Sequence, residues 1–146
     1  MGFMFYRASE FAPTVDNNLM MMSEEVEKRL KQVRILGEAI RASMCNELHK
    51  MGFKDSDTLV GRFDMAHFEL SRDPYDGQES LKGTWRNGKG HSVGSILFYP
   101  DGAFYAEYDV VRPHPSQEKW FVEAVTAWGR GDQVKTEARL LPSLTD

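Results

Sequence analysis

Two runs of apolar and aromatic residues in the stretch Ser95 to Val111 are separated by the short sequence YPDG at residues 99–102. Pro100 pre-sets φ at about −65°, and Gly102 can adopt a positive φ without a Cβ clash. These are the features of a β-hairpin with a three-residue loop, a type I turn followed by a glycine bulge. The pattern therefore predicts two antiparallel strands in which Tyr99 pairs with Ala103.

The predicted register sorts the hairpin side chains onto two faces. Phe98 is expected opposite Phe104 on one face, and Leu97 opposite Tyr105 on the other. Antiparallel sheets commonly bury one face and leave the other in contact with water. We therefore expect the phenylalanine face to be covered by helices and the Leu97 and Tyr105 face to be open.

A long helix is predicted from Ser23 to Met51, because apolar residues recur there at spacings of three and four. Ser23 is a good N-cap, and the glutamates that follow it suit the positive end of the helix dipole. Gly52 is expected to end the helix in a left-handed cap, with Phe53 in contact with Leu48. The apolar stripe consists of Val26, Leu30, Val33, Gly37, Ile40, Met44, Leu48 and Met51.

Three further segments have patterns typical of strands, namely residues 59–71, 81–86 and 133–141. The first and last alternate between two sets of side chains, and the second is a short segment that contains Trp85. The dipeptide Asn87-Gly88 is expected to turn the second segment into the first strand of the hairpin. Together with the two hairpin strands, these segments predict a sheet of about five strands.

A second helix is predicted from Ser116 to Gly129, with Ser116 as its cap and Gly129 at its end. Its apolar stripe consists of Phe121, Ala124, Val125 and Trp128. The predicted order of elements is α-β-β-β-β-α-β. Strands joined by short links, with helices towards the two ends, favour an α+β fold of two layers, in which two helices pack on one face of an antiparallel sheet.

The first 22 residues show no period of either a helix or a strand. We interpret residues 1–22 as a loosely attached N-terminal extension and residues 23–146 as a single α+β domain. The alternative is that the aromatic residues of the extension form an arm that docks on a partner. These aromatic residues are Phe3, Phe5, Tyr6 and Phe11.

Charge and cysteine content limit the classes of partner and compartment. The net charge is −4 and no segment forms a basic stripe, so we expect no nucleic-acid partner. No apolar run approaches the roughly 18 residues of a membrane span, so we expect no membrane partner. The single Cys45, expected on the core side of the first helix, makes no intrachain disulfide and fits a cytoplasmic location.

One segment comes close to a phosphate-binding motif. Residues 83–90 nearly match the sequence GxxxxGK followed by Ser or Thr, but Gly90 stands where the hydroxyl is needed. The segment is also predicted to join two strands, so we interpret it as a hairpin turn. The four histidines are scattered and show no spacing typical of metal ligands, and no nucleophile-elbow sequence is present. We therefore expect neither a metal nor a cofactor.

Exposed aromatic residues are the least ordinary feature of the predicted surface. On the expected open face, Tyr99 and Tyr105 accompany Leu97. Trp120, next to the second predicted helical stripe, is expected to be partly exposed to solvent. Such side chains supply contact area together with a polar group, as interface anchors do. The candidate binding surface consists of Leu97, Tyr99, Tyr105 and Trp120. The expected partner is another protein or a second copy of this chain.

A competing hypothesis uses a polar cluster at one end of the sheet. Antiparallel pairing places two histidines, an aspartate and an arginine towards this end; they are His91, Asp109, Arg112 and His114. Such a cluster would belong to a small enzyme or a ligand-binding protein. No motif assigns the chain to a family. We favour a non-enzymatic interaction domain of the adaptor, chaperone or immunity type.

Overall fold

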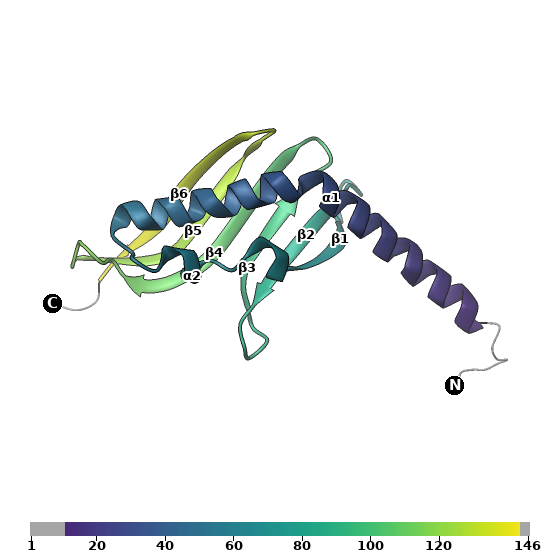
Figure 1. Cartoon of the computed structure of the whole chain (residues 1–146), viewed down its shortest axis with the longest axis horizontal. Coiled ribbons are helices and arrows are strands. Elements are labelled where there is room, and N and C mark those ends of the chain that lie inside the picture. Colours follow the sequence, from purple (N-terminus) through teal and green to yellow (C-terminus); the bar gives the residue numbers. More distant parts are fainter. Residues whose placement is uncertain (1–10, 144–146) are drawn as a thin grey trace. The chain divides into compact units, whose positions relative to one another are not determined.

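The computed structural model describes the backbone of residues 11–143 and the side chains of residues 21–143. Its fold is α+β, with one antiparallel sheet of six strands in the order β1-β2-β3-β4-β5-β6 (Figure 1). The elements are α1 (Phe11–Met51), α2 (Ser56–Leu59), the short 3-10 helix η1 (Phe63–Met65), β1 (His67–Arg72), β2 (Glu79–Arg86), β3 (Ser92–Phe98), β4 (Ala103–Pro113), β5 (Trp120–Arg130) and β6 (Gln133–Pro142). The predicted fold class is confirmed, with six strands in place of about five.

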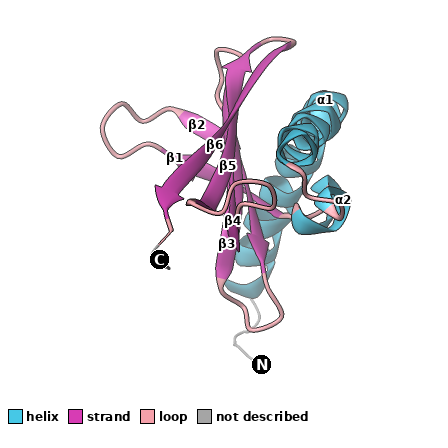
Figure 2. Ribbon diagram, turned by 90° about the vertical axis from the view of Figure 1, so that its left-hand side faces the viewer, coloured by secondary structure: helices cyan, strands magenta, loops and turns pink. Residues whose placement is uncertain are grey.

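The chain divides into two units, Met1–Gln32 and Val33–Asp146, and α1 contributes residues to both. Within the second unit, the remainder of α1 and the short α2 lie on one side of the sheet (Figure 2). Residues 11–22 are part of α1, so Ser23 lies inside the helix and the predicted N-cap is wrong. The attachment of residues 1–22 stays a prediction, and the side chains of the suggested aromatic arm lie outside the described residues.

The C-terminal end of α1 has the predicted geometry. Gly52 has a φ of 111°, and its N–H donates to the carbonyl of His49 at 3.0 Å. The N–H of Phe53 donates to the carbonyl of Leu48 at 3.2 Å. These two hydrogen bonds define a Schellman motif, which satisfies carbonyl groups that the end of a helix leaves unpaired.

The core lies between α1 and the sheet. Ile40 and Leu48 of the predicted stripe are fully buried. Gly37, in the same stripe, lies directly against Phe63, since a Cβ at this position would be 2.2 Å from the phenyl ring. Phe63 in turn packs edge-on against Phe98 of the sheet, with ring centroids 6.3 Å apart. The glycine thus lets a large aromatic side chain join the helix to the sheet.

The hairpin between β3 and β4 has the predicted register. Phe98 pairs with Phe104, and Leu97 pairs with Tyr105. Gly102 has a φ of 91°, as the glycine bulge requires. Both phenylalanines are buried, whereas Tyr105 is exposed. The sequence pattern alone therefore identifies which face of the hairpin enters the core.

The segment that resembles a phosphate-binding loop is a hairpin, as interpreted. It joins β2 to β3, and the N–H of Asn87 donates to the carbonyl of His91 at 2.9 Å. The residue with positive φ is Gly90, at 82°, rather than a residue of the Asn87-Gly88 pair. The turn is thus one glycine later than predicted, and it has the same three-residue form as the next hairpin.

The second predicted helix is wrong: residues 120–130 form strand β5. The reason is a β-bulge in this strand. Val122 pairs with Leu140 and Val125 pairs with Ala138, so three steps along β5 match two steps along β6. Directly paired residues share a face, so the bulge puts two buried valines three residues apart on the same face. That spacing is also the spacing of a helical stripe.

The first predicted strand is shorter than expected. Residues 56–65 hold α2 and η1, and β1 begins only at His67. Side chains from the rest of the domain satisfy the carbonyls of this irregular segment. The indole N–H of Trp85 donates to the backbone carbonyl of Arg62 at 2.8 Å, and the Arg41 guanidinium donates to the backbone carbonyl of Val60 at 2.9 Å. These contacts fix the segment in place while Phe63 enters the core.

Candidate functional site

The sheet face that points away from α2 and from the part of α1 in the second unit, here called the open face, carries a row of large side chains. Leu97 on β3 pairs with Tyr105 on β4, and Tyr105 pairs with Trp128 on β5. Paired residues of an antiparallel sheet lie on the same face, so the three side chains are neighbours. We call Leu97, Tyr105 and Trp128 the aromatic row. Figure 2 shows α2 and the second-unit part of α1 on the opposite side of the sheet.

The aromatic row is accessible to solvent. Tyr105 is 37% exposed, and Tyr99, the residue that follows β3, is 39% exposed. Leu97 and Trp128 are half-buried. Tyr99 follows Leu97 by two residues, so alternation places both on the open face. Three of the four residues of the predicted binding surface therefore share one face, as expected.

Trp120 does not join them. It pairs with Pro142 at the other end of β5, eight residues from Trp128, or roughly 25 Å along the strand. The tryptophan next to Tyr105 is Trp128, which sequence reasoning assigned to a helical stripe. The sequence Gly131-Asp132 could have identified it, because this pair forms a two-residue hairpin loop in which Gly131 has a φ of 65°.

A network of polar side chains borders the aromatic row. Arg139 on β6 forms ion pairs with Glu107 at 2.6 Å and with Glu123 at 3.0 Å. The Tyr105 hydroxyl is 3.2 Å from the same Glu107 carboxylate and donates to it. Residues from three strands are thus tied together, and this limits the freedom of the Tyr105 ring.

Burial and neighbouring carboxylates both oppose ionisation in this network. Burial raises the pKa of Asp109, and the nearby carboxylates of Glu107 and Glu123 raise it further, whereas Arg139 lowers it. Burial also raises the pKa of the Tyr105 phenol, with a further contribution from Glu107. Both groups therefore resist taking on negative charge.

An open hollow of about 520 Å³ lies at the end of the aromatic row. It is lined by Tyr105, Thr126, Trp128, Glu137 and Arg139. Thr126 is held by a hydrogen bond to the backbone carbonyl of Glu137 at 3.2 Å. No side chain among the described residues forms a hydrogen bond or ion pair with the Glu137 carboxylate.

His114, from the predicted polar cluster, is a buried structural residue. Its Nδ1 accepts hydrogen bonds from the backbone N–H groups of Ser116 and Gln117, both at 3.1 Å. The Ser116 hydroxyl donates to the carbonyl of Met51 at 3.0 Å. The histidine thus shapes the loop after β4, and this loop caps the C-terminal end of α1.

The other members of the polar cluster lie in different surroundings. His91 is exposed in the loop after β2, where its backbone N–H donates to the Asn87 side chain at 3.0 Å. Asp109 belongs to the network on the open face, and Arg112 is exposed beyond an irregularity in β4. Within residues 21–143, no hydrogen bond or ion pair joins any two of His91, Asp109, Arg112 and His114.

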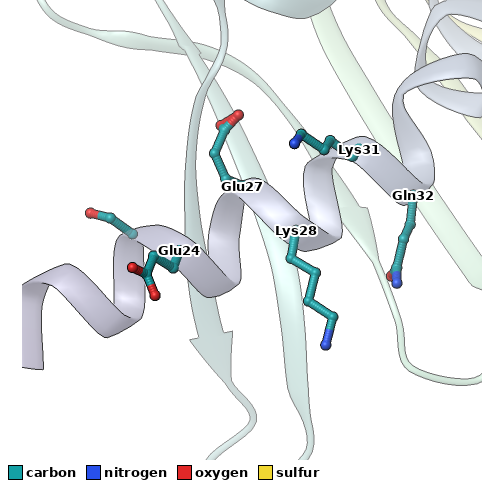
Figure 3. A pocket seen from close by; sticks show the side chains of 6 residues that line it. Glu24, Glu27, Lys28, Lys31 and Gln32 are labelled. Atoms are coloured by element: carbon teal, nitrogen blue, oxygen red, sulfur yellow. The ribbon is translucent and has the colours of Figure 1, made fainter.

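A second depression, of about 570 Å³, lies along α1 in the first unit. All its lining residues come from this one helix: Ser23, Glu24, Glu27, Lys28, Lys31 and Gln32. Figure 3 shows their side chains diverging from the helix. Glutamates and lysines four residues apart stabilise an exposed helix, which accounts for the arrangement without a ligand.

Cys45 is buried in α1, and burial raises the pKa of its thiol, which suits a core residue. Among the described residues, no three His, Cys, Asp or Glu side chains are placed to hold a metal ion. No helix in that part of the chain has a stretch apolar enough to cross a lipid bilayer. Comparisons of the chain with protein-family models, curated proteins and solved structures found no match, so the candidate site is defined by its geometry alone.

Proposed function

We propose that this protein is a small cytoplasmic interaction domain that binds a partner protein through the open face of its sheet. The observation that carries the proposal is the pair Tyr105 and Trp128, directly opposite each other on adjacent strands of a face that no described helix of the second unit covers. Tyrosine and tryptophan are enriched at protein interfaces because they combine a large contact area with a polar group. Adaptor, chaperone and immunity proteins are the classes that such a surface suits.

The rigidity of the surface supports this proposal. The row residues stand on three consecutive strands, and the Tyr105 ring is held by its hydroxyl contact with Glu107. A surface that is ordered before binding loses less conformational entropy when a partner docks.

The competing class, an enzyme or ligand-binding protein that uses the polar cluster, has less support. Nδ1 of His114 already accepts two backbone hydrogen bonds, and His91 lies exposed in a separate loop. A catalytic site requires polar groups that converge on one place. We therefore prefer the open face as the functional surface.

The proposal is tested by affinity capture from the source cell, followed by quantitative mass spectrometry. The test variant is Tyr99→Ser combined with Tyr105→Ser, and we expect it to lose proteins that the unmodified domain retains. The matched control is Tyr75→Ser, because Tyr75 lies in the loop between β1 and β2 and is 97% exposed. A protein lost by the double variant and kept by the control supports the open face. Equal capture by all three proteins contradicts it.

A further inference from the structure

We propose that the open face recognises its partner through a cationic side chain, a lysine or an arginine, which enters the hollow beside Tyr105 and Trp128. This inference rests on the proposed function and adds the chemistry of the partner. The hollow combines two aromatic rings with the carboxylate of Glu137. These are the groups that an ammonium or guanidinium group binds best.

The charge around the hollow favours a cation. Two basic groups lie there: Arg139 lines the hollow, and Lys135 lies opposite Trp128 on the edge strand. Four carboxylates lie in or beside it, those of Glu107, Asp109, Glu123 and Glu137. Lys82 lies opposite Leu97 in the same row, and Arg130 is paired with Asp101. The local net charge is therefore −1 when these four carboxylates, Arg139, Lys135 and Lys82 are ionised. A cationic side chain is attracted to this region and an anionic one is repelled.

Arg139 does not make the hollow a site for anions. Its guanidinium is already paired with Glu107 and Glu123, at 2.6 and 3.0 Å. An anion near Arg139 would have to approach these two carboxylates and Glu137 as well. The Glu137 carboxylate, in contrast, has no ion-pair partner among the described residues and remains available to a cation.

The aromatic residues favour a cation with an apolar stem. Trp128 and Tyr105 both line the hollow, and a positive charge over the face of an indole or phenol ring is attracted by the ring electrons. The methylene groups of lysine or arginine can pack against the same rings while the charged end meets Glu137. A simple metal cation lacks such a stem, so we expect a polypeptide side chain as the occupant.

The inference is tested by NMR titration of the full chain labelled with ¹⁵N. The probes are three capped peptides of equal length, in which glycine alternates with arginine, lysine or uncharged citrulline. We expect the arginine and lysine peptides to shift the indole N–H signal of Trp128, and the citrulline peptide to leave it unchanged. The indoles of buried Trp85 and distant Trp120 serve as internal references. Equal shifts from the neutral peptide would overturn the inference.

A pair of charge variants tests the role of the hollow itself. Glu137→Gln should weaken binding of the arginine peptide about three- to fivefold, since it removes one carboxylate contact. Glu38→Gln makes the same charge change at an exposed position on α1 and should leave the affinity unchanged. Equal losses from both variants, or none from Glu137→Gln, would show that the hollow does not select a cation.

These outcomes are separable from those of the proposed function. If the tyrosine double variant loses its cellular partner while the peptides show no preference for positive charge, the open face binds a protein of different chemistry. If the charged peptides bind as expected but capture is unaffected by the tyrosine changes, the proposed function fails and the hollow is merely a weak cation site.

Discussion

The ionisation of Asp109 is opposed by its surroundings. Burial is the largest cause, and Glu107 and Glu123 add repulsion that Arg139 offsets only in part. The pKa of this carboxyl in the folded protein therefore lies above its value in the unfolded chain, which is about 3.9. A carboxyl group whose pKa is higher in the folded than in the unfolded state makes folding less favourable once the pH is high enough to ionise it.

We expect Asp109→Asn to raise the thermal midpoint at pH 7. The variant removes a charge that destabilises the folded state above the raised pKa, and it changes little below about pH 3, where the carboxyl is neutral in both states. The measurement is the thermal midpoint of both proteins across this pH range. A gain that is the same at every pH would assign the effect to side-chain packing instead of charge.

At the scale of elements, each strand of the β3–β4 hairpin presents one face to the core and one to solvent. Phe104 is 2% exposed and Tyr105, the next residue, is 37% exposed. The glycine turn sets the register of this alternation, and a shift of one residue would exchange the two faces. The register thus decides which aromatic residues stabilise the domain and which are available for binding.

Alanine substitution at these two positions should have unequal effects. We expect Phe104→Ala to lower the free energy of unfolding by roughly 3–5 kcal/mol, because it leaves a cavity in the core. Tyr105→Ala should cost much less, since its ring is largely held at the surface. Denaturant unfolding of both variants gives the comparison. Equal losses would indicate that the hairpin pairs with a different register in solution.

The difference between predictable and unpredictable elements lies in whether the signal is local. The β3–β4 hairpin and the end of α1 are predictable because Gly102 and Gly52 determine backbone conformation within a few residues. Strand β5 is harder to predict, because the bulge after Val122 produces the spacing of a helix, and the only local signal against a helix is the Gly131-Asp132 turn that pairs β5 with β6. The same error hides Trp128, and with it half of the central aromatic pair of the candidate site.

At the scale of the whole molecule, the second unit has two unlike faces. One face of the sheet is covered by helical residues, with Ile40, Met44 and Leu48 fully buried, and the other carries the aromatic row and an excess of carboxylates. The net charge of the chain is only −4, so the clustering of carboxylates around Arg139 is a local feature that the composition does not reveal. Binding is expected to concentrate on this face.

The measurement that tests this account most directly is the affinity of the captured partner for three purified proteins: the unmodified domain, Tyr99→Ser/Tyr105→Ser, and His114→Asn. Calorimetry should show a loss that approaches about 30-fold for each tyrosine that acts as an anchor, which corresponds to roughly 2 kcal/mol per site. His114→Asn keeps a hydrogen-bond acceptor for the loop after β4 and should bind the partner normally. Normal binding by the tyrosine variant, together with a loss in His114→Asn, would contradict the account and transfer the function to the other end of the sheet.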